Sequence, residues 1–331
     1  MPRSWTGQEV AEVVAAHPEW LGAPLSAGEP HRVGRGESYE AWLPAPAGPL
    51  VRFARRPIGE LPADPAEEVA GMRLAPQGVG PRPIGADVLW VDDEQYPVVA
   101  QEFVPGRVLA PIEWTGALRR VLAAQLATLH TVTYPRPGSV RGVSQALDPE
   151  PGRLDFAAEV DGIIDHWAPR LPGAPGEAWA ALCGPMQRYA AEVAPEIAAL
   201  QEFSLIHGDP VLTNIVVDGN RPVLIDWEWT QIGDPARDLG FIGGAVHAGD
   251  WYAALTDEEI TDLLRAYVSA GGRGEVVALR RRRDAWLAAE GLAVLAYLWW
   301  VDADPAQAIT PANRSAAADL QRTVAAYLAA W

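Results

Sequence analysis

Along the N-terminal third of the chain, the spacing at which apolar residues recur changes several times. Each change predicts a different helix, strand or turn. Thr6-Gly7-Gln8-Glu9 has the form of a capping box, and valines follow it at helical spacing, so a short opening helix is expected. Residues 31–43 predict a strand, a glycine turn and a second strand, and residues 50–56 a further strand after the Pro- and Gly-rich turn at 44–49. A helix over residues 65–74 follows, with Pro65 in its first turn.

The rest of the chain alternates between apolar runs and helical spacing. Residues 96–104 are apolar and strand-like, and residues 117–130 predict a helix that ends at His130, a core or capping histidine. A long Pro- and Gly-rich loop is expected at 134–153, helices over most of 156–202, and another helix after the capping box at 256–259. The longest apolar segment, 286–301, contains Glu290 and is shorter than the ~20 residues that span a bilayer, so it predicts a buried helix. The basic run at 280–283 before it is interpreted as a solvated helix face.

The sharpest boundary between apolar and polar positions lies near residue 207. An apolar run leads into His207-Gly208-Asp209, and Asn214 follows five positions after Asp209. Two β-branched or apolar runs, 215–217 and 223–225, flank the turn signal Asp218-Gly219-Asn220, which predicts a hairpin. Such a hairpin brings Asn214 at its start close to Asp226 at its end.

Three oxygen-bearing side chains in this arrangement suit one kind of chemistry. Asp209, Asn214 and Asp226 offer hard ligands that favour Mg²⁺ over zinc. Phosphoryl transfer needs one carboxylate to position a hydroxyl and further oxygens to hold magnesium against phosphates. An Asp after a turn glycine is also a common helix cap, so Asp209 alone is not diagnostic, whereas the combination is.

The motifs, taken in order, resemble those of the aminoglycoside phosphotransferase family. The resemblance is carried by His207-Gly208-Asp209 with Asn214, by Ile225-Asp226-Trp227-Glu228, and by Gly233-Asp234-Pro235 with Asp238-Leu239. It implies an α+β, bilobal, protein-kinase-like fold, with an antiparallel sheet in an N-lobe at 1–104 and a larger, mainly helical C-lobe at 105–331. It also implies that Asp209 is the catalytic base, that Asn214 and Asp226 bind Mg²⁺, and that His207 and Asp238 are structural supports.

The resemblance further implies that ATP or GTP, as phosphoryl donor, lies between the lobes. The glycine turn at 33–39 would form a flap over the phosphates with Ser38 as a contact, although a hairpin turn without a ligand has the same form. Kinases of this fold carry a lysine on the strand at 50–56, and Arg52 occupies the matching place here. Glu68 is the helix carboxylate expected to pair with Arg52, with Glu67 nearly as suitable.

A hinge between the lobes is expected near residues 101–106. Backbone groups around Gln101, Glu102 and Val104 would bind the adenine edge. Backbone makes such contacts, so the side chains at these positions carry little information.

The amino-acid composition limits the classes of partner that this protein is expected to bind. The 331 residues carry a formal net charge of −17, which argues against nucleic acid and anionic membranes and attracts a cationic substrate, although acidity also serves solubility. A single cysteine, Cys183, excludes an intrachain disulfide and a cysteine zinc cluster. The N-terminus has no apolar signal core, so a cytoplasmic protein is expected. Oligomeric state is not indicated.

The expected function is transfer of the γ-phosphoryl group of ATP or GTP to a hydroxyl of a small molecule. Acidity favours a cationic antibiotic such as an aminoglycoside, or a macrolide, with Glu228 and Asp234 as candidate contacts, and hence a role in antibiotic resistance. Open alternatives are a choline-, homoserine- or sugar-kinase-like metabolite kinase, a nucleotide-binding pseudokinase module, and a metal-dependent phosphatase. Of the 14 tryptophans, most are expected in the core, and some are candidates for lining a pocket for a ring-rich substrate.

Overall fold

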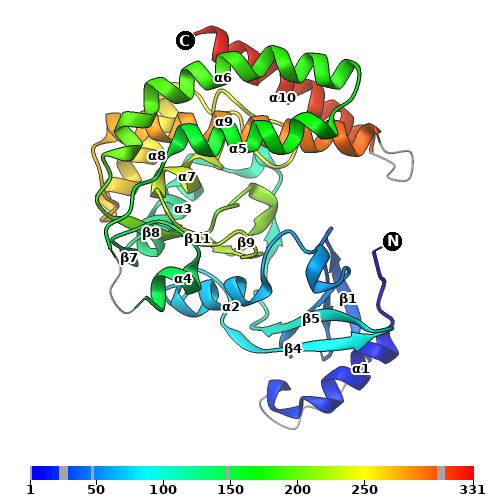
Figure 1. Ribbon diagram of the computed structural model, residues 1–331. Helices are drawn as coiled ribbons and strands as arrows, with labels where there is room; N and C mark the ends of the chain where they lie inside the picture. Colours follow the sequence, from blue (N-terminus) through cyan, green and yellow to red (C-terminus); the bar gives the residue numbers. More distant parts are fainter. Residues whose placement is uncertain (1, 22–28, 46–47, 147–149, 304–309) are drawn as a thin grey trace.

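The computed structural model describes residues 2–21, 29–45, 48–146, 150–303 and 310–331. Its N-terminal lobe is built on a five-stranded antiparallel sheet in the order β1-β2-β3-β5-β4 (Figure 1). The strands are β1 (His31–Arg35), β2 (Tyr39–Leu43), β3 (Leu50–Ala54), β4 (Pro83–Val91) and β5 (Glu94–Gln101). Helix α1 (Gly7–Ala16) and the 3-10 turn η1 (Pro18–Leu21) cover one face, and α2 (Pro65–Leu74) lies toward the other lobe. A short turn, η2 (Ile58–Glu60), precedes α2.

The C-terminal lobe is mainly helical and holds two small sheets, β10-β9-β6 and β11-β8-β7. Its first half contains β6 (Arg107–Val108), η3 (Pro111–Glu113), α3 (Gly116–Leu129), β7 (Thr133–Tyr134), α4 (Val140–Ser144), α5 (Phe156–Trp167), η4 (Ala168–Arg170) and α6 (Ala174–Ala198). Its second half contains β8 (Phe203–Ile206), η5 (Leu212–Asn214), β9 (Ile215–Asp218), β10 (Arg221–Leu224), β11 (Gln231–Gly233), α7 (Pro235–Gly240), α8 (Asp257–Ser269), α9 (Val276–Ala303) and α10 (Pro311–Ala329). Figure 1 shows α5 and α9 side by side, with α6 and α10 beyond them. No helix in the described part of the chain is long and apolar enough to cross a membrane.

Most predicted elements are confirmed, because capping, apolar period and turn chemistry agree locally. Thr6 and Thr256 each close a capping box at the start of a helix. The hairpin around residue 219 pairs β9 with β10, and Gly219 has a φ of 61°, which its lack of a side chain allows. His130 is buried at the end of α3, as expected of a core or capping histidine. The chain leaves the N-lobe sheet after Gln101 and joins the C-lobe at Arg107, so the proposed boundary after residue 104 lies in this connection.

Two local expectations need correction, and one strand was not predicted. The basic run at 280–283 is not a solvated face, because Arg282 and Arg283 are 7% and 0% exposed; Arg282 pairs with Asp234, and Arg283 bonds the carbonyl of Leu239. Strand β4 carries no clear sequence signal, since it is an edge strand with many exposed positions. The loop expected at 134–153 contains the short helix α4, and residues 147–149 lie outside the described residues, as do 46–47 of the turn at 44–49.

Trp227 packs the loop between α2 and β4 onto the C-lobe. Its ring is fully buried beside the imidazole of His207, and its indole N–H donates to the carbonyl of Leu224 at 3.0 Å. Gly80 lies against the Nε1 edge of this ring, where a Cβ would lie 2.6 Å from Trp227 Cζ2. The interface between the lobes therefore has no room for a side chain at residue 80.

Gly80→Ala is expected to lower the free energy of unfolding by about 1–3 kcal/mol, since overpacking a rigid ring displaces it or its surroundings. The matched control is Gly59→Ala, because a Cβ there meets nothing within 4 Å. Urea unfolding of both variants measures the difference. Equal unfolding free energies for the two variants would show that the packing around Trp227 accommodates the added methyl group without loss of stability.

Candidate active site

Strand β8 delivers His207-Gly208-Asp209 to the end of the C-lobe that faces the N-lobe, and Asp238 of α7 holds this loop. Both oxygens of the Asp238 carboxylate accept backbone hydrogen bonds, from His207 N at 2.8 Å and Gly208 N at 2.9 Å. His130 Nε2 lies 3.2 Å from the same carboxylate. Burial by itself raises the pKa of Asp238, but His130, His207 and the Gly208 N–H together hold that pKa below its usual value.

Asp238→Asn is expected to cost about 1–3 kcal/mol of unfolding free energy, because one of two buried N–H groups then faces an amide N–H₂. The sign of the pH effect follows from the lowered pKa of Asp238. Its stabilisation is present above the unfolded pKa of about 3.9 and is lost as pH falls through the lower folded value. The free energy of unfolding, measured with denaturant between pH 7 and pH 3, should therefore fall less on acidification in Asp238→Asn than in the wild type. Asp262→Asn, on an exposed carboxylate paired with Arg120, is the control.

His207 ties the catalytic loop to the segment that follows β10. Its imidazole is fully buried, and Nε2 donates to the carbonyl of Ile225 at 3.0 Å. Burial lowers the pKa of His207, and Asp209 N donates to Nδ1 at 3.4 Å, so Nε2 is the nitrogen that carries the N–H. Ile225 N in turn donates to the carbonyl of Asn214 at 2.9 Å, which closes the hairpin at its base.

Asp209 and Asn214 are in direct contact. Asn214 Nδ2 donates to Asp209 Oδ2 at 2.9 Å and to the Asp209 carbonyl at 3.1 Å. Burial first, and then the charges of Asp226, Glu290 and Glu228, raise the pKa of Asp209 well above its usual value, with Arg237 opposing them. The other side-chain oxygens of the pair, Asp209 Oδ1 and Asn214 Oδ1, accept no hydrogen bond among the described residues.

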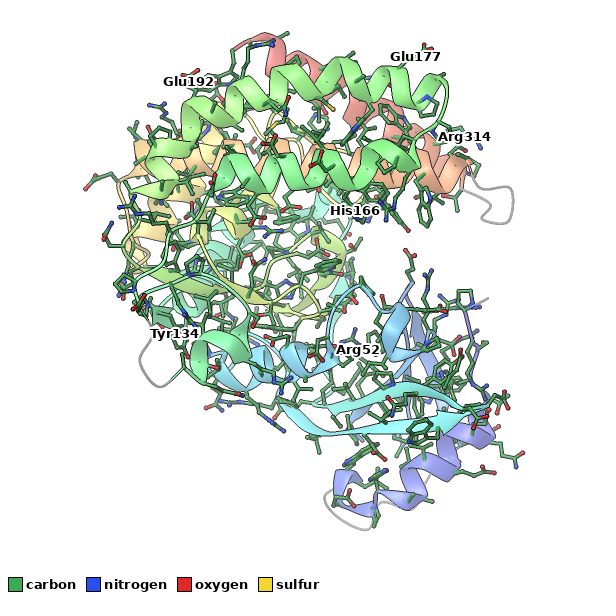
Figure 2. The ribbon with its side chains drawn as sticks, in the orientation of Figure 1. Arg52, Tyr134, His166, Glu177, Glu192 and Arg314 are labelled. Carbon is green, nitrogen blue, oxygen red and sulfur yellow. The ribbon has the colours of Figure 1, made fainter. Side chains whose placement is uncertain are left out.

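Asp226 meets the N-lobe. It has a φ of 65°, a left-handed conformation that Asp and Asn tolerate better than most residues. Arg52 Nη2 of β3 donates to Asp226 Oδ1 at 2.5 Å, while Nη1 pairs with Glu68 of α2. The Arg52 guanidinium also lies over the ring of Tyr39, 4.4 Å from its centre, and Figure 2 shows it on the side of the sheet that faces the C-lobe. One guanidinium thus joins the sheet, α2 and the hairpin.

In the structure, Arg52 pairs with Glu68 and not with Glu67. Glu67 accepts a hydrogen bond from Arg141 N at 3.0 Å instead. Glu68 is fully buried, and burial ahead of the charge of Asp226 raises its pKa, while Arg52 opposes both. The charges of Glu68 and Asp226 outweigh the effect of burial on Arg52 and raise its pKa, so the guanidinium stays charged.

The donor set fits a magnesium ion bound with phosphates. The Asp226 side chain is 37% exposed, and Asn214 Oδ1, on the neighbouring segment, accepts no hydrogen bond from the residues that the structure describes. In the ranges that the structure describes, no three side chains of His, Cys, Asp or Glu converge to hold a metal by themselves. Mg²⁺ is commonly bound by one or two carboxylates together with substrate phosphates, so Asp226 and Asn214 suffice for that mode.

The two carboxylates expected near an acceptor have different surroundings. Glu228 lies beside Asp226 and Arg52 and accepts a hydrogen bond from Ser38 of the β1–β2 turn; burial and the charge of Asp226 raise its pKa to about 7. Its role as an acceptor contact stays a prediction. Asp234 is 0% exposed, caps α7 at Ala236 N, and accepts from Arg282 Nε at 3.0 Å and Trp286 Nε1 at 3.2 Å. We correct the prediction for Asp234, because its carboxylate offers no free face to an acceptor.

The hinge leaves a specific pair of backbone groups free. Gln101 completes β5 opposite Leu50 and Pro83, and Glu102 N donates to the carbonyl of Arg82 at 2.9 Å. The Glu102 carboxylate accepts from Arg82 N at 3.1 Å. Among the described residues, the Glu102 carbonyl and the Val104 N–H make no hydrogen bond, and both are available to a ligand edge.

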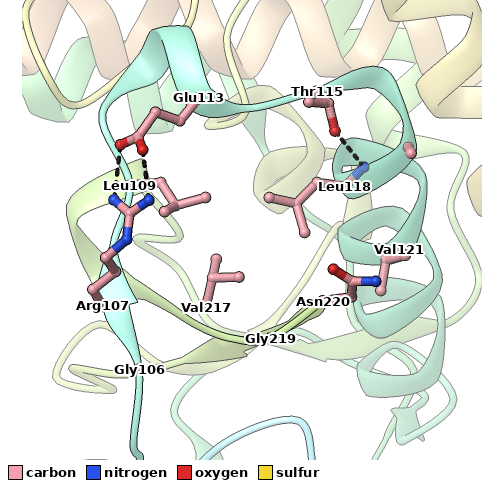
Figure 3. Close-up of a pocket in the computed structure, with 11 residues that line it drawn as sticks. Gly106, Arg107, Leu109, Glu113, Thr115, Leu118, Val121, Val217, Gly219 and Asn220 are labelled. Atoms are coloured by element: carbon pink, nitrogen blue, oxygen red, sulfur yellow. Dashed lines mark hydrogen bonds and ion pairs between the residues drawn. The ribbon is translucent and has the colours of Figure 1, made fainter.

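Sequence reasoning missed an ion pair beside Asp209. Arg237 of α7 pairs with Glu290 of α9 at 2.5 Å, and both side chains are largely buried. The available signal was Glu290 itself, the lone carboxylate in the longest apolar segment. A cavity of about 640 Å³ lies elsewhere, at the far end of the hairpin beside Arg107, Glu113 and Asn220 (Figure 3). None of the predicted site residues lines it.

Comparisons with known proteins place the chain in context. A family model described as phosphotransferase enzyme family matches residues 39–286. A choline/ethanolamine kinase family protein from Mesorhizobium loti has a TM-score of 0.60 at 19% identity, covering 96% of this chain and 94% of that one. Aminoglycoside phosphotransferase APH(4)-Ia, in its AMP-PNP and hygromycin B complex, has a TM-score of 0.59 at 15% identity, covering 92% of this chain and 94% of that one. The GDP and kanamycin complex of an APH(2″) enzyme has a TM-score of 0.61 at 14% identity, covering 98% of this chain and 99% of that one. These likenesses show the fold; a comparison with curated proteins found no match.

Proposed function

Because the chain belongs to the phosphotransferase enzyme family, we propose that it transfers the γ-phosphoryl group of ATP or GTP to a hydroxyl of a small molecule. One observation carries the proposal. The contacts Asn214–Asp209, Ile225–Asn214 and Asp226–Arg52 bring the catalytic loop, the hairpin and the N-lobe strand to a single place. Phosphoryl transfer depends on positioning and electrostatics, and this convergence supplies both.

The donor nucleotide is proposed to lie between the lobes. The Glu102 carbonyl and the Val104 N–H, beside Gln101, are the groups that would bind an adenine or guanine edge. Arg52, held by Glu68 and Asp226, and Ser38 of the β1–β2 turn would contact the phosphates. Asn214 and Asp226 hold Mg²⁺, which when bound neutralises charge on the transferring phosphates.

Asp209 is proposed as the catalytic base. Asn214 fixes Oδ2, so Oδ1 is left to accept the proton of the acceptor hydroxyl. As the acceptor oxygen bonds to the γ-phosphorus, the bond to the β–γ bridging oxygen breaks, and the hydroxyl proton passes to Asp209. The raised pKa of Asp209 suits a group that takes up this proton late in the reaction.

We place a cationic antibiotic, such as an aminoglycoside, first among acceptors. The net charge of −17 supports a cation, and a fold-level relative binds hygromycin B. A choline-type metabolite kinase is the second candidate, since another fold-level relative is a choline/ethanolamine kinase family protein. The intact set Asp209, Asn214 and Asp226 argues against a pseudokinase module.

A nucleotide-consumption screen tests the function. The protein is mixed with Mg²⁺, ATP or GTP, and aminoglycosides, macrolides, choline, ethanolamine, homoserine or sugars, and release of the diphosphate is followed. Acceptor-dependent release is the expected result. Nucleotide binding without release for any acceptor would favour the pseudokinase module, and phosphate release from monoesters without nucleotide would favour a phosphatase.

A further inference from the structure

Arg52 is the cation proposed to contact the phosphates, and its side chain is long and rotatable. A guanidinium binds phosphate best when its planar fork meets two oxygens at once, so its orientation decides how well it binds. Fixing an arginine in one rotamer costs conformational entropy, and a nucleotide would have to meet that cost on binding. The structure instead fixes Arg52 beforehand, because the side chain is largely buried and has several partners.

Tyr39 of β2 is the partner that covers the Arg52 guanidinium. The register of β2 and β3 places Tyr39 opposite Ala54, and Ala41 opposite Arg52. Tyr39 and Arg52 are therefore diagonal neighbours on one face of the sheet, within reach of long side chains. The residue directly opposite Arg52 is a small alanine, which leaves room for the guanidinium to lie over the Tyr39 ring, its central carbon 4.4 Å from the ring centre.

Tyr39 and Glu68 are the partners that Arg52 keeps when the site is loaded. Arg52 Nη1 pairs with Glu68, and Nη2 donates to Asp226. Asp226 is also a proposed magnesium ligand, and a carboxylate that binds a divalent cation shares its charge with it, so its contact with Arg52 weakens. The Glu68 carboxylate and the Tyr39 ring are then left to hold the guanidinium.

Tyr39 holds Arg52 through its ring and not through its hydroxyl. The residue is 6% exposed, and desolvation strengthens the attraction between a cation and an aromatic face. Burial first, and then the charge of Glu68, raise the pKa of Tyr39, so the phenol is neutral. The hydroxyl makes no hydrogen bond with the residues that the structure describes. A phenylalanine at this position would therefore keep the contact with Arg52.

We propose that Tyr39 is a positioning residue for the donor nucleotide, because its ring holds the Arg52 guanidinium in the orientation that meets the phosphates. The ring acts through Arg52, so Tyr39 is not itself a catalytic residue. The inference rests on the proposed phosphoryl transfer, in which Arg52 contacts the phosphates. It gives Tyr39 a role in nucleotide affinity that a ring packed only for stability would not have.

Nucleotide binding without acceptor tests the inference. ATP and GTP are titrated with Mg²⁺ by calorimetry into the wild type, Tyr39→Leu, Tyr39→Phe and Phe53→Leu. Tyr39→Leu should raise the Kd of the nucleotide that the wild type binds by about 5- to 30-fold, the contribution of a desolvated cation–π contact. Tyr39→Phe keeps the ring and should stay within about twofold of the wild type. Phe53→Leu is the matched control, because this fully buried ring of β3 packs on the opposite face of the sheet and should leave the Kd unchanged.

A double-mutant cycle asks whether Tyr39 acts through Arg52. Arg52→Lys keeps the positive charge, but an ammonium is compact and strongly hydrated and does not stack on a ring as a guanidinium does. In the Arg52→Lys background, Tyr39→Leu should therefore change the Kd by no more than about threefold, since side chains that act through one another are not additive. An equal fold-change in both backgrounds overturns the inference.

Denaturant unfolding, measured on every variant, checks that each one folds, and Tyr39→Met repeats the test if Tyr39→Leu does not. A nucleotide Kd of Tyr39→Leu equal to that of the wild type contradicts the inference. So does a loss of affinity in Tyr39→Phe or in Phe53→Leu as large as that in Tyr39→Leu. The proposed function is judged separately: it fails if the wild type binds neither nucleotide, or consumes neither with an acceptor of any class.

Discussion

Asp209→Asn is expected to lower kcat by about 10²- to 10⁴-fold, the usual contribution of a positioned general base. The amide keeps the shape of the carboxylate and the neighbourhood of Asn214, so the affinity for nucleotide should not change. Single-turnover phosphoryl transfer to the best acceptor measures the effect. In the wild type, kcat/KM should rise with pH as Asp209 ionises, and this rise should be absent from the residual activity of the variant.

Stability separates a catalytic role of Asp209 from a structural one. Burial and the charge of Asp226 raise the pKa of Asp209, so ionising it costs the folded state free energy above the unfolded pKa. Asp209→Asn should therefore unfold at the same or a higher denaturant concentration at pH 8. Asp218→Asn, on an exposed carboxylate of the same hairpin, serves as control and should keep full activity. A clear loss of stability in Asp209→Asn would assign the residue to structure.

Asp226→Asn is the second substitution with a large expected effect. We expect kcat to fall by about 10³-fold, because removing a charged magnesium ligand forfeits several kcal/mol of charge stabilisation in the transition state. Asparagine is chosen because the φ of 65° at this position would strain alanine. The activity lost should be recovered in part at high Mg²⁺ concentration, which a titration of rate against Mg²⁺ measures.

Asp92 is a matched control for both the positive φ and the carboxylate of Asp226. Asp92, in the β4–β5 turn, also has a positive φ, 51°, and its exposed carboxylate is far from the hairpin in sequence. Asp92→Asn should show wild-type Mg²⁺ dependence. An Asp226→Asn enzyme with the wild-type rate and Mg²⁺ requirement would contradict the proposed metal site.

Local signals were sufficient for much of the site. The turn at Gly219 and the apolar runs around it predict the hairpin, and the hairpin brings Asn214 and Asp226 together. Glu68 was expected to pair with Arg52, with Glu67 nearly as suitable, and the structure pairs Arg52 with Glu68. Sequence reasoning failed for Asp234, because acidity near a site in sequence says nothing about which side of the chain a carboxylate faces.

Contacts between distant segments account for what was missed. Arg282 and Arg283 look like a solvated run, yet α9 buries them against Asp234 and the carbonyl of Leu239. The pair Arg237–Glu290 joins helices that are 53 positions apart, and no local pattern encodes such a meeting.

The sequence by itself determined the elements and the identity of the reactive groups, because capping boxes, turn glycines and apolar periods act over a few neighbouring residues. Only the tertiary structure decided what each charge faces. It turned Asp234 inward, set Glu228 beside Ser38, and paired Glu290 with Arg237. The physical reason is that burial and pairing of a charge depend on the packing of remote helices, which local chemistry does not specify.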